Sequence, residues 1–122
     1  MWRVLGLFFL FWMPLESLAK KTKTVDCDEL TEIESQDSST NTYTLNDKPF
    51  TGKCESYYPN GQKSWEGNFK DGKPHGTSNW WYESGQKSSK WSFKDGKEHG
   101  TYTTWYNNGQ KEWEGNWKDG DH

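Results

Sequence analysis

Branched aliphatic side chains are nearly absent from most of this 122-residue chain. After residue 19 the only Val, Leu, Ile or Met residues are Val25, Leu30, Ile33 and Leu45, and from residue 46 onward there are none. Rossmann sheets, TIM barrels and helical bundles all need a layered core of such side chains. The sequence therefore excludes these three architectures for the last two thirds of the chain.

Arginine is missing after Arg3, and the formal net charge of the chain is −3. Proteins that bind nucleic acids usually carry a basic surplus rich in Arg, so the composition excludes that class of partner. Acidic side chains gather in residues 26–37, which hold six Asp or Glu residues and no Lys. We expect residues 20–42 to be an acidic, largely irregular N-terminal segment.

Motifs that carry enzyme chemistry are also lacking. The chain contains no Gly-x-Ser-x-Gly sequence, no phosphate-binding loop and no zinc-ligand spacing. The sequence therefore predicts a protein that is not an enzyme, with no catalytic residue, no cofactor and no metal site.

The first nineteen residues have the three-part pattern of a secretory signal peptide. Arg3 precedes an apolar run of twelve residues, and small residues end the segment at Ala19, where cleavage is expected. An uncleaved anchor is the alternative, but a spanning helix needs roughly 20 apolar residues, and this run is interrupted by Pro14. We expect an exported protein, periplasmic or extracellular, that meets the membrane only through residues 1–19.

Cysteine is scarce, since Cys27 and Cys54 are the only two in the chain. In an oxidising compartment an even number of cysteines favours a disulfide, and these two allow a single intramolecular pairing. Two unpaired thiols, or a bridge to another molecule, are the alternatives. A Cys27–Cys54 bridge would tie the acidic segment to the rest of the chain.

A 24-residue repeat organises residues 43–122 into about three and a half copies. It is marked by three Gly-Gln-Lys sequences spaced 24 residues apart. Each copy contains two turn dipeptides. These are Asn60-Gly61, Ser84-Gly85 and Asn108-Gly109 in one set, and Asp71-Gly72, Asp95-Gly96 and Asp119-Gly120 in the other. Both sets favour type I′ turns, whose two central residues have positive φ.

The segments between the turns are rich in Thr, Trp, Tyr and Phe, which is typical of strands. Between the first and second copies the Trp moves by two positions, from Trp65 to Trp91, and a small residue takes its place, which preserves one face of a strand. The sequence thus predicts an all-β fold, an antiparallel meander of β-hairpins in a single elongated twisted sheet. The expected strands lie near residues 52–58, 62–70, 76–82, 86–94, 100–106 and 110–118.

Two sets of repeated polar residues are the only candidates in the sequence for a metal site or for catalytic carboxylates. His75 and His99 lie on strands two apart, roughly 10 Å from each other, which is too far to share a metal ion. We interpret both as turn residues whose imidazoles pack against or bond to the Lys-Asp-Gly turns. Asp71, Asp95 and Asp119 are likewise interpreted as the first residues of tight turns and not as paired catalytic carboxylates.

The repeating unit reads Trp-Tyr-x-x-Gly-Gln-Lys, then an aromatic residue, then Lys-Asp-Gly-Lys-x-His-Gly-Thr. This unit resembles the MORN-variant repeat. That repeat is found in bacterial proteins grouped as the YwqK-type antitoxin family, and the resemblance covers residues 45–122. It implies a β-hairpin array in an elongated curved sheet and a toxin as partner. MORN repeats are also linked to membrane lipids and scaffolding, and the missing basic surplus argues against the lipid role here.

The large aromatic side chains are the candidate contacts with a partner, since Trp and Tyr dominate binding hot spots. Three of them recur at one repeat position and are expected to stack as a ladder, which could equally be the core of a one-layer sheet. Strand 110–118 is also an open edge that can accept another strand. The candidate partner-binding residues are Tyr57, Trp81, Trp105, Trp113 and Trp117.

These features predict an exported, non-enzymatic repeat protein that binds a protein partner through its aromatic face or its edge strand. Two alternatives remain open. One is a module that binds envelope glycan on Trp platforms, and the other is a toxin-neutralising antitoxin, as the family resemblance implies.

Overall fold

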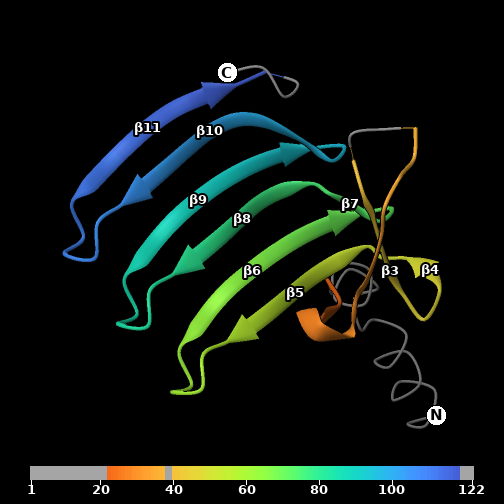
Figure 1. Ribbon diagram of the computed structural model, residues 1–122, viewed down its shortest axis with the longest axis horizontal. Coiled ribbons are helices and arrows are strands. Elements are labelled where there is room, and N and C mark those ends of the chain that lie inside the picture. The colour runs from red at the N-terminus through yellow and green to blue at the C-terminus, as the bar shows by residue number, and fades with distance from the viewer. Residues whose placement is uncertain (1–21, 38–39, 119–122) are drawn as a thin grey trace, which may run out of the picture.

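The repeats fold into one long meander of β-hairpins, seen in the computed structural model, which describes residues 22–37 and 40–118 (Figure 1). The six expected strands are all present and differ from their expected bounds by three residues at most. Their bounds are β5 (Gly52–Tyr57), β6 (Lys63–Lys70), β8 (Gly76–Trp81), β9 (Lys87–Lys94), β10 (Lys97–Trp105) and β11 (Lys111–Trp117). The predicted all-β fold class is confirmed. The expected signal peptide lies outside the described residues.

The strand order of the main sheet is β1-β5-β6-β8-β9-β10-β11, where β1 is Thr24–Asp26, and the short β7 (Lys73–Pro74) pairs with β6. Every pair in the sheet is antiparallel except the first, in which β1 runs parallel to β5. The sheet therefore has two different ends. We call the side of β1 and β5 the capped end and the side of β10 and β11 the open end.

A second, three-stranded sheet in the order β2-β3-β4 was not expected from the sequence. It consists of β2 (Thr31–Ile33), β3 (Thr42–Leu45) and β4 (Lys48–Pro49), and a 3-10 turn, η1 (Cys27–Glu29), leads into it. The acidic segment thus carries β1, η1 and β2 and is more regular than its composition indicates. None of the described segments is a helix long and apolar enough to cross a membrane.

The Cys27–Cys54 disulfide joins the acidic segment to β5, with Cα atoms 4.8 Å apart, in agreement with the pairing inferred from the sequence. Cys54 is fully buried. At the start of η1 the Asp26 side chain accepts a hydrogen bond from the Asp28 amide, and Glu29 accepts one from the Asp26 amide, which forms a capping box. Local hydrogen bonds and one covalent link therefore fix this segment against the sheet.

The two sets of turns differ in geometry, and the type I′ expectation is correct for only one of them. Asp71 and Asp95 have φ near 51°, and the glycines after them also have positive φ, as a type I′ turn requires. In the other set only Gly61, Gly85 and Gly109 have positive φ. There each Gly follows a type I turn, as in the hydrogen bond from the Gly61 amide to the Tyr58 carbonyl, 2.9 Å.

The expectation of a type I′ turn at Asn60-Gly61 was wrong because these loops have three residues. The Tyr58 amide donates to the Gln62 carbonyl at 2.8 Å, so Gly61 and Gln62 together oppose a single residue in a G1 bulge. The Asn60 side chain instead accepts a hydrogen bond from the Gln62 amide at 2.9 Å, which explains an Asn at this position without positive φ.

Strand register divides the sheet into two unlike faces. Trp65 lies opposite Trp80, and Trp91 lies opposite Tyr102, so these rings share one face. We call it the aromatic face. Glu66 lies opposite Asn79, and the other face, the polar face, carries Thr, Ser, Lys and Glu at most positions.

The buried core lies on the aromatic face at the capped end. Phe50, Cys54 and Phe69 form it, and Phe69 is only 6% exposed. Three of the four aliphatic residues found after position 19 pack against this cluster, namely Val25, Leu30 and Leu45. The acidic segment and the β3–β4 hairpin therefore supply the branched hydrocarbon that the repeats lack.

Consecutive repeats are also joined by hydrogen bonds that recur with the repeat period. The Tyr58 hydroxyl donates to the Trp81 carbonyl at 2.6 Å, and the Tyr82 hydroxyl donates to the Trp105 carbonyl at 2.7 Å. The equivalent residue of the last copy, Tyr106, is 51% exposed and has no following strand to bond among the described residues. Within residues 22–37 and 40–118, the inter-repeat hydrogen bond is therefore made by Tyr58 and Tyr82 and not by Tyr106.

Candidate functional site

A cluster of four rings lies on the aromatic face at the open end. The Trp91 and Tyr102 rings stack with centroids 5.1 Å apart, and the Trp117 ring lies 5.7 Å from Tyr102 and 6.1 Å from Trp91. The Trp113 indole N–H donates a hydrogen bond to the Tyr102 hydroxyl. We call Trp91, Tyr102, Trp113 and Trp117 the open-end ring cluster; strands β9, β10 and β11 supply its members.

The glycine in the middle of β11 makes room for this arrangement. A Cβ atom added to Gly115 would lie 2.6 Å from the Tyr102 hydroxyl oxygen and 2.7 Å from two of its ring carbons. The Tyr102 ring therefore lies directly over the Gly115 backbone, where it is 94% buried, since its exposed fraction is 6%. A ring laid over a cross-strand glycine is a known way to pin strand register. The cluster is accordingly a fixed surface.

The outer side of the cluster is open to solvent. Trp113 is 56% exposed, the highest value among the tryptophans of the described residues. The aliphatic side chains that could cover it lie elsewhere, since Val25, Leu30 and Leu45 pack at the capped end and Ile33 is 51% exposed. Exposed aromatic surface of this kind marks interaction sites.

A comparison with known protein families identifies the repeat. The family model described as the MORN repeat variant matches residues 50–71, 74–95 and 98–119, which is more than half of the chain. The chain belongs to the MORN repeat variant family. No curated protein and no solved structure matches it. MORN repeats are generally modules that bind proteins or membranes and are typically non-enzymatic.

The five candidate binding residues do not form one surface in this MORN array. Trp113 and Trp117 belong to the open-end ring cluster. Tyr57, Trp81 and Trp105 each follow a residue that register places on the aromatic face, so these three lie on the polar face. No ring contact joins them to one another within the described residues, and the expected stacked ladder is wrong.

Two lysine side chains lie over one of the rings on the polar face. The Lys63 and Lys87 ammonium groups lie 5.5 and 5.6 Å from the centre of the Trp81 ring. Cation–π contacts of this kind occupy the ring face that a stacked neighbour or a flat ligand would need. Tyr57 is 56% exposed, and its hydroxyl donates to Glu55 at 3.2 Å.

Sequence reasoning missed Trp91 and Tyr102 as members of the site. A signal for Trp91 was present, because the Trp moves by two positions in the second copy and Ser89 takes its former place. Tyr102 gave no such signal: it occupies a position held by Ser78 in the preceding copy and Cys54 in the one before that. Only the register of β10 against β9 and β11 brings it between Trp91 and Gly115.

A chain of charges crosses the polar face near the capped end. Lys63 forms ion pairs with Glu55 and with Glu66, the latter at 3.0 Å, and Lys53 lies 3.9 Å from Glu66. The hydrogen bond from Lys63 holds the pKa of Glu55 below its ordinary value, and the same bond raises the pKa of Lys63. These charges are satisfied within the chain and stabilise β5 against β6.

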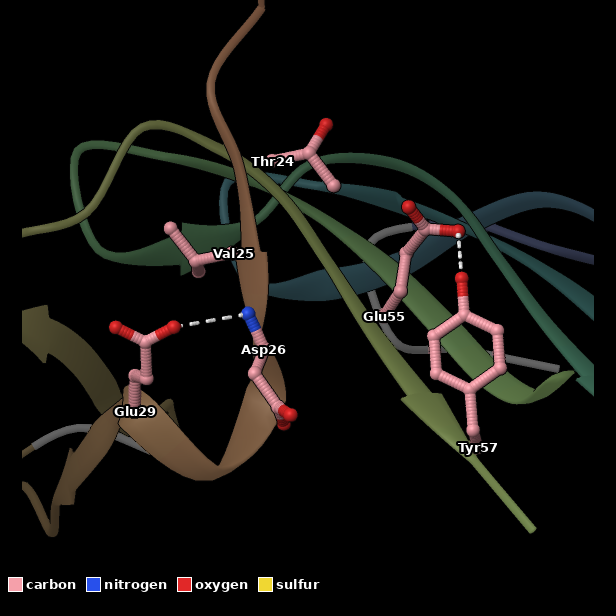
Figure 2. Close-up of a pocket in the computed structure, with 6 residues that line it drawn as sticks. All are labelled: Thr24, Val25, Asp26, Glu29, Glu55 and Tyr57. Carbon is pink, nitrogen blue, oxygen red and sulfur yellow. Dashed lines mark hydrogen bonds between the residues drawn. The ribbon is translucent and has the colours of Figure 1, made fainter. Parts of the chain in front are cut away.

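An open pocket of about 270 Å³ lies between the acidic segment and β5 (Figure 2). Three carboxylates line it, those of Asp26, Glu29 and Glu55. Each of them already accepts a hydrogen bond from the chain itself, two within the capping box and one from Tyr57. We interpret the pocket as the seam between the acidic segment and the sheet.

His75 acts as a turn residue, as the sequence indicates. His75 Nδ1 accepts a hydrogen bond from the Asp95 amide at 3.3 Å, and the Thr51 hydroxyl accepts the equivalent bond from the Asp71 amide at 2.9 Å. Thr51 and His75 hold the same repeat position. Within residues 22–37 and 40–118, no three His, Cys, Asp or Glu side chains are placed to hold a metal ion. Asp119 lies outside the described residues.

Proposed function

We propose that this chain is an exported, non-enzymatic module that binds a protein partner through the open-end ring cluster. The observation that carries the proposal is the contrast between the two ends of one aromatic face. At the capped end the rings are covered, and at the open end Trp113 is more than half exposed. The general role of MORN repeats as protein- or membrane-binding modules supports the same conclusion.

The capped end also indicates what the partner looks like. There Val25, Leu30 and Leu45 lie against rings of the aromatic face, and none of these residues belongs to the three matched repeats. The repeat therefore receives aliphatic side chains from outside itself. We expect the partner to present Leu, Ile or Val side chains to Trp91, Trp113 and Trp117 in the same manner.

Export is part of the proposal. It is supported by the signal-like pattern of residues 1–19 and by the Cys27–Cys54 disulfide, since disulfides persist in oxidising compartments. A processed N-terminus after Ala19, read by mass spectrometry of the protein from the envelope fraction, is the expected result. Protein that retains residues 1–19 and carries free thiols in the cytosol would contradict export.

Photo-crosslinking tests the binding surface. A photoreactive phenylalanine analogue replaces Trp113 in one sample and Tyr57, which is equally exposed, in the control. We expect one protein other than a second copy of this chain to be captured at position 113 and not at position 57. With that protein purified, Trp113→Ala should weaken binding by about tenfold or more, as for an aromatic hot spot. Equal capture at both positions, or unchanged affinity of Trp113→Ala, would contradict the proposal.

The same samples distinguish the two alternatives. A glycan module would sediment with isolated cell-wall material and lose this property on Trp105→Ala; the lysines over Trp81 disfavour that use of the polar face. An antitoxin would have a toxin as the captured protein and would rescue cells that express it. Capture of a non-toxin protein at position 113, with no wall binding, is the outcome that the proposal expects.

A further inference from the structure

The two edges of the main sheet are not equally available. At the capped end, β1 pairs with β5 across Lys53–Glu55, so the edge of β5 is occupied there. At the open end, β11 pairs with β10 on one side only among the described residues. Head-to-tail stacking of copies would need β11 to pair with β5, and β1 stands in its place. A contact of β11 with β11 of a second copy would satisfy this edge.

The structure contains a model for such a contact at the junction of β6 and β8, which joins the first repeat to the second. Trp65 lies opposite Trp80 with the rings stacked, centroids 6.0 Å apart. On the other face Glu66 lies opposite Asn79, whose amide donates to the carboxylate at 3.1 Å. The junction thus pairs the dipeptide Trp-Glu with the dipeptide Asn-Trp.

Strand β11 contains both of these dipeptides. It runs Trp113-Glu114-Gly115-Asn116-Trp117, with the two dipeptides on either side of Gly115. Antiparallel pairing about Gly115 places Trp113 opposite the partner's Trp117 and Glu114 opposite the partner's Asn116. Glu114 also pairs with Lys111 as Glu66 pairs with Lys63, so the environment of the carboxylate is repeated as well.

The next pair outward adds opposite charges. In the same register Glu112, which is the bulged residue of β11 against β10, comes near the partner's Lys118, and twofold symmetry makes this approach twice. A shift by one step toward the N-terminus centres the pairing on Glu114 and sets two like charges against each other. Charge therefore opposes this shift, and the ring and amide pairs favour the register centred on Gly115.

We propose that a second copy of this chain binds the β11 edge, forming a symmetric dimer centred on Gly115. The two main sheets then become one continuous sheet, and both open-end ring clusters lie on the same face of it. This inference rests on the edge of β11 and does not depend on the proposed protein partner.

Sedimentation velocity of the full chain over a concentration series tests the dimer. We expect a reversible change from the mass of one chain to the mass of two. Glu112→Lys brings Lys near the partner's Lys118 and should raise the dissociation constant about tenfold, since the approach of like charges occurs twice. Lys118→Glu should do the same. The double variant Glu112→Lys/Lys118→Glu restores opposite charges and should restore the original constant.

Two controls keep the result specific. Tyr57→Ala removes an equally exposed ring at the capped end and should leave the dissociation constant unchanged. Each variant is checked for the native far-ultraviolet spectrum and thermal transition. A chain that stays monomeric at the highest soluble concentration would overturn the proposal, as would a dimer that neither single charge variant weakens. The charge variants should keep their affinity for the partner captured at position 113, so that failure of one proposal leaves the other standing.

Discussion

The capped and open ends of this sheet are built from the same repeat but are stabilised differently. Phe69 at the capped end and Phe93 one repeat later occupy equivalent positions, yet Phe69 is 94% buried and Phe93 only partly so. The difference comes from outside the repeats, because Val25, Leu30 and Leu45 reach only the first of these positions. At the open end the repeats bury a single ring, Tyr102, among other rings, whereas the core at the capped end is closed by aliphatic side chains from another segment.

The largest expected difference between the ends is the cost of removing equivalent rings. Phe69→Ala should lower the free energy of unfolding by about 3–4 kcal/mol, because it leaves a cavity in the closed core. Phe93→Ala should cost about 1–2 kcal/mol, since its ring is partly solvated already. Urea denaturation of both variants measures the difference. Equal losses would show that the two ends are packed alike.

Removing the disulfide should loosen the capped end alone. Cys27→Ser/Cys54→Ser should lower the free energy of unfolding by about 2–4 kcal/mol, as for a bridge that closes a loop of this size. Hydrogen exchange followed by mass spectrometry should show faster local exchange in β1, η1 and β5, with β9–β11 changed only through global unfolding. A uniform rise of local exchange over the whole sheet would break the distinction between the ends.

The tyrosine series measures where the array stops. Tyr58→Phe and Tyr82→Phe each remove a hydrogen bond to the next repeat and should cost about 1 kcal/mol. Tyr106→Phe removes a hydroxyl at the open end and should cost less than about 0.3 kcal/mol in the monomer. Thermal unfolding of the three variants at low concentration gives the comparison. A loss at Tyr106 as large as at Tyr82 would mean that another segment covers the open end.

Removing ion pairs should give the smallest difference in stability between the two ends. Glu55→Gln should lower the free energy of unfolding by about 0.5 kcal/mol at neutral pH, since the Glu55–Lys63 pair is partly exposed. Glu114→Gln, whose pair with Lys111 is more than half exposed, should have no measurable effect in the monomer.

The pKa of Glu55 sets the pH range of this effect. Because the folded state lowers that pKa, the stabilisation is complete above the unfolded value, near about 4.3 for Glu, and is lost as pH falls through the folded value. The free energies of unfolding of the wild type and of Glu55→Gln should therefore become equal in acid. Denaturation midpoints of the two proteins are measured from about pH 3 to about pH 7. Midpoints that move apart as the pH falls would contradict the expected sign.

The repeat fold could be predicted almost completely, because turn residues, ring alternation and the 24-residue period all indicated the same hairpins. The three-residue loops could not be told from type I′ turns, since Asn-Gly suits both and the difference depends on where the ladder resumes after Gly61. The second, three-stranded sheet was missed because β2, β3 and β4 are two to four residues long and gain their stability from tertiary contacts.

The candidate site was predictable only in part. Trp113 and Trp117 stood out as rings on an edge strand, whereas the choice between the two faces depended on register at the bulges near Trp81 and Trp105. A one-residue irregularity reverses the side on which a ring points, and composition does not reveal it.

Hydroxyl-radical footprinting of the purified full chain tests the contrast between the ends most directly. Labelling of each ring, relative to the same ring in unfolded protein, is read by mass spectrometry. At a concentration where the chain is monomeric, we predict that Phe50 and Phe69 are strongly protected while Trp113 keeps a much larger share of its unfolded-state labelling. Protection of Trp113 equal to that of Phe69 in the isolated monomer would contradict an uncovered ring surface at the open end.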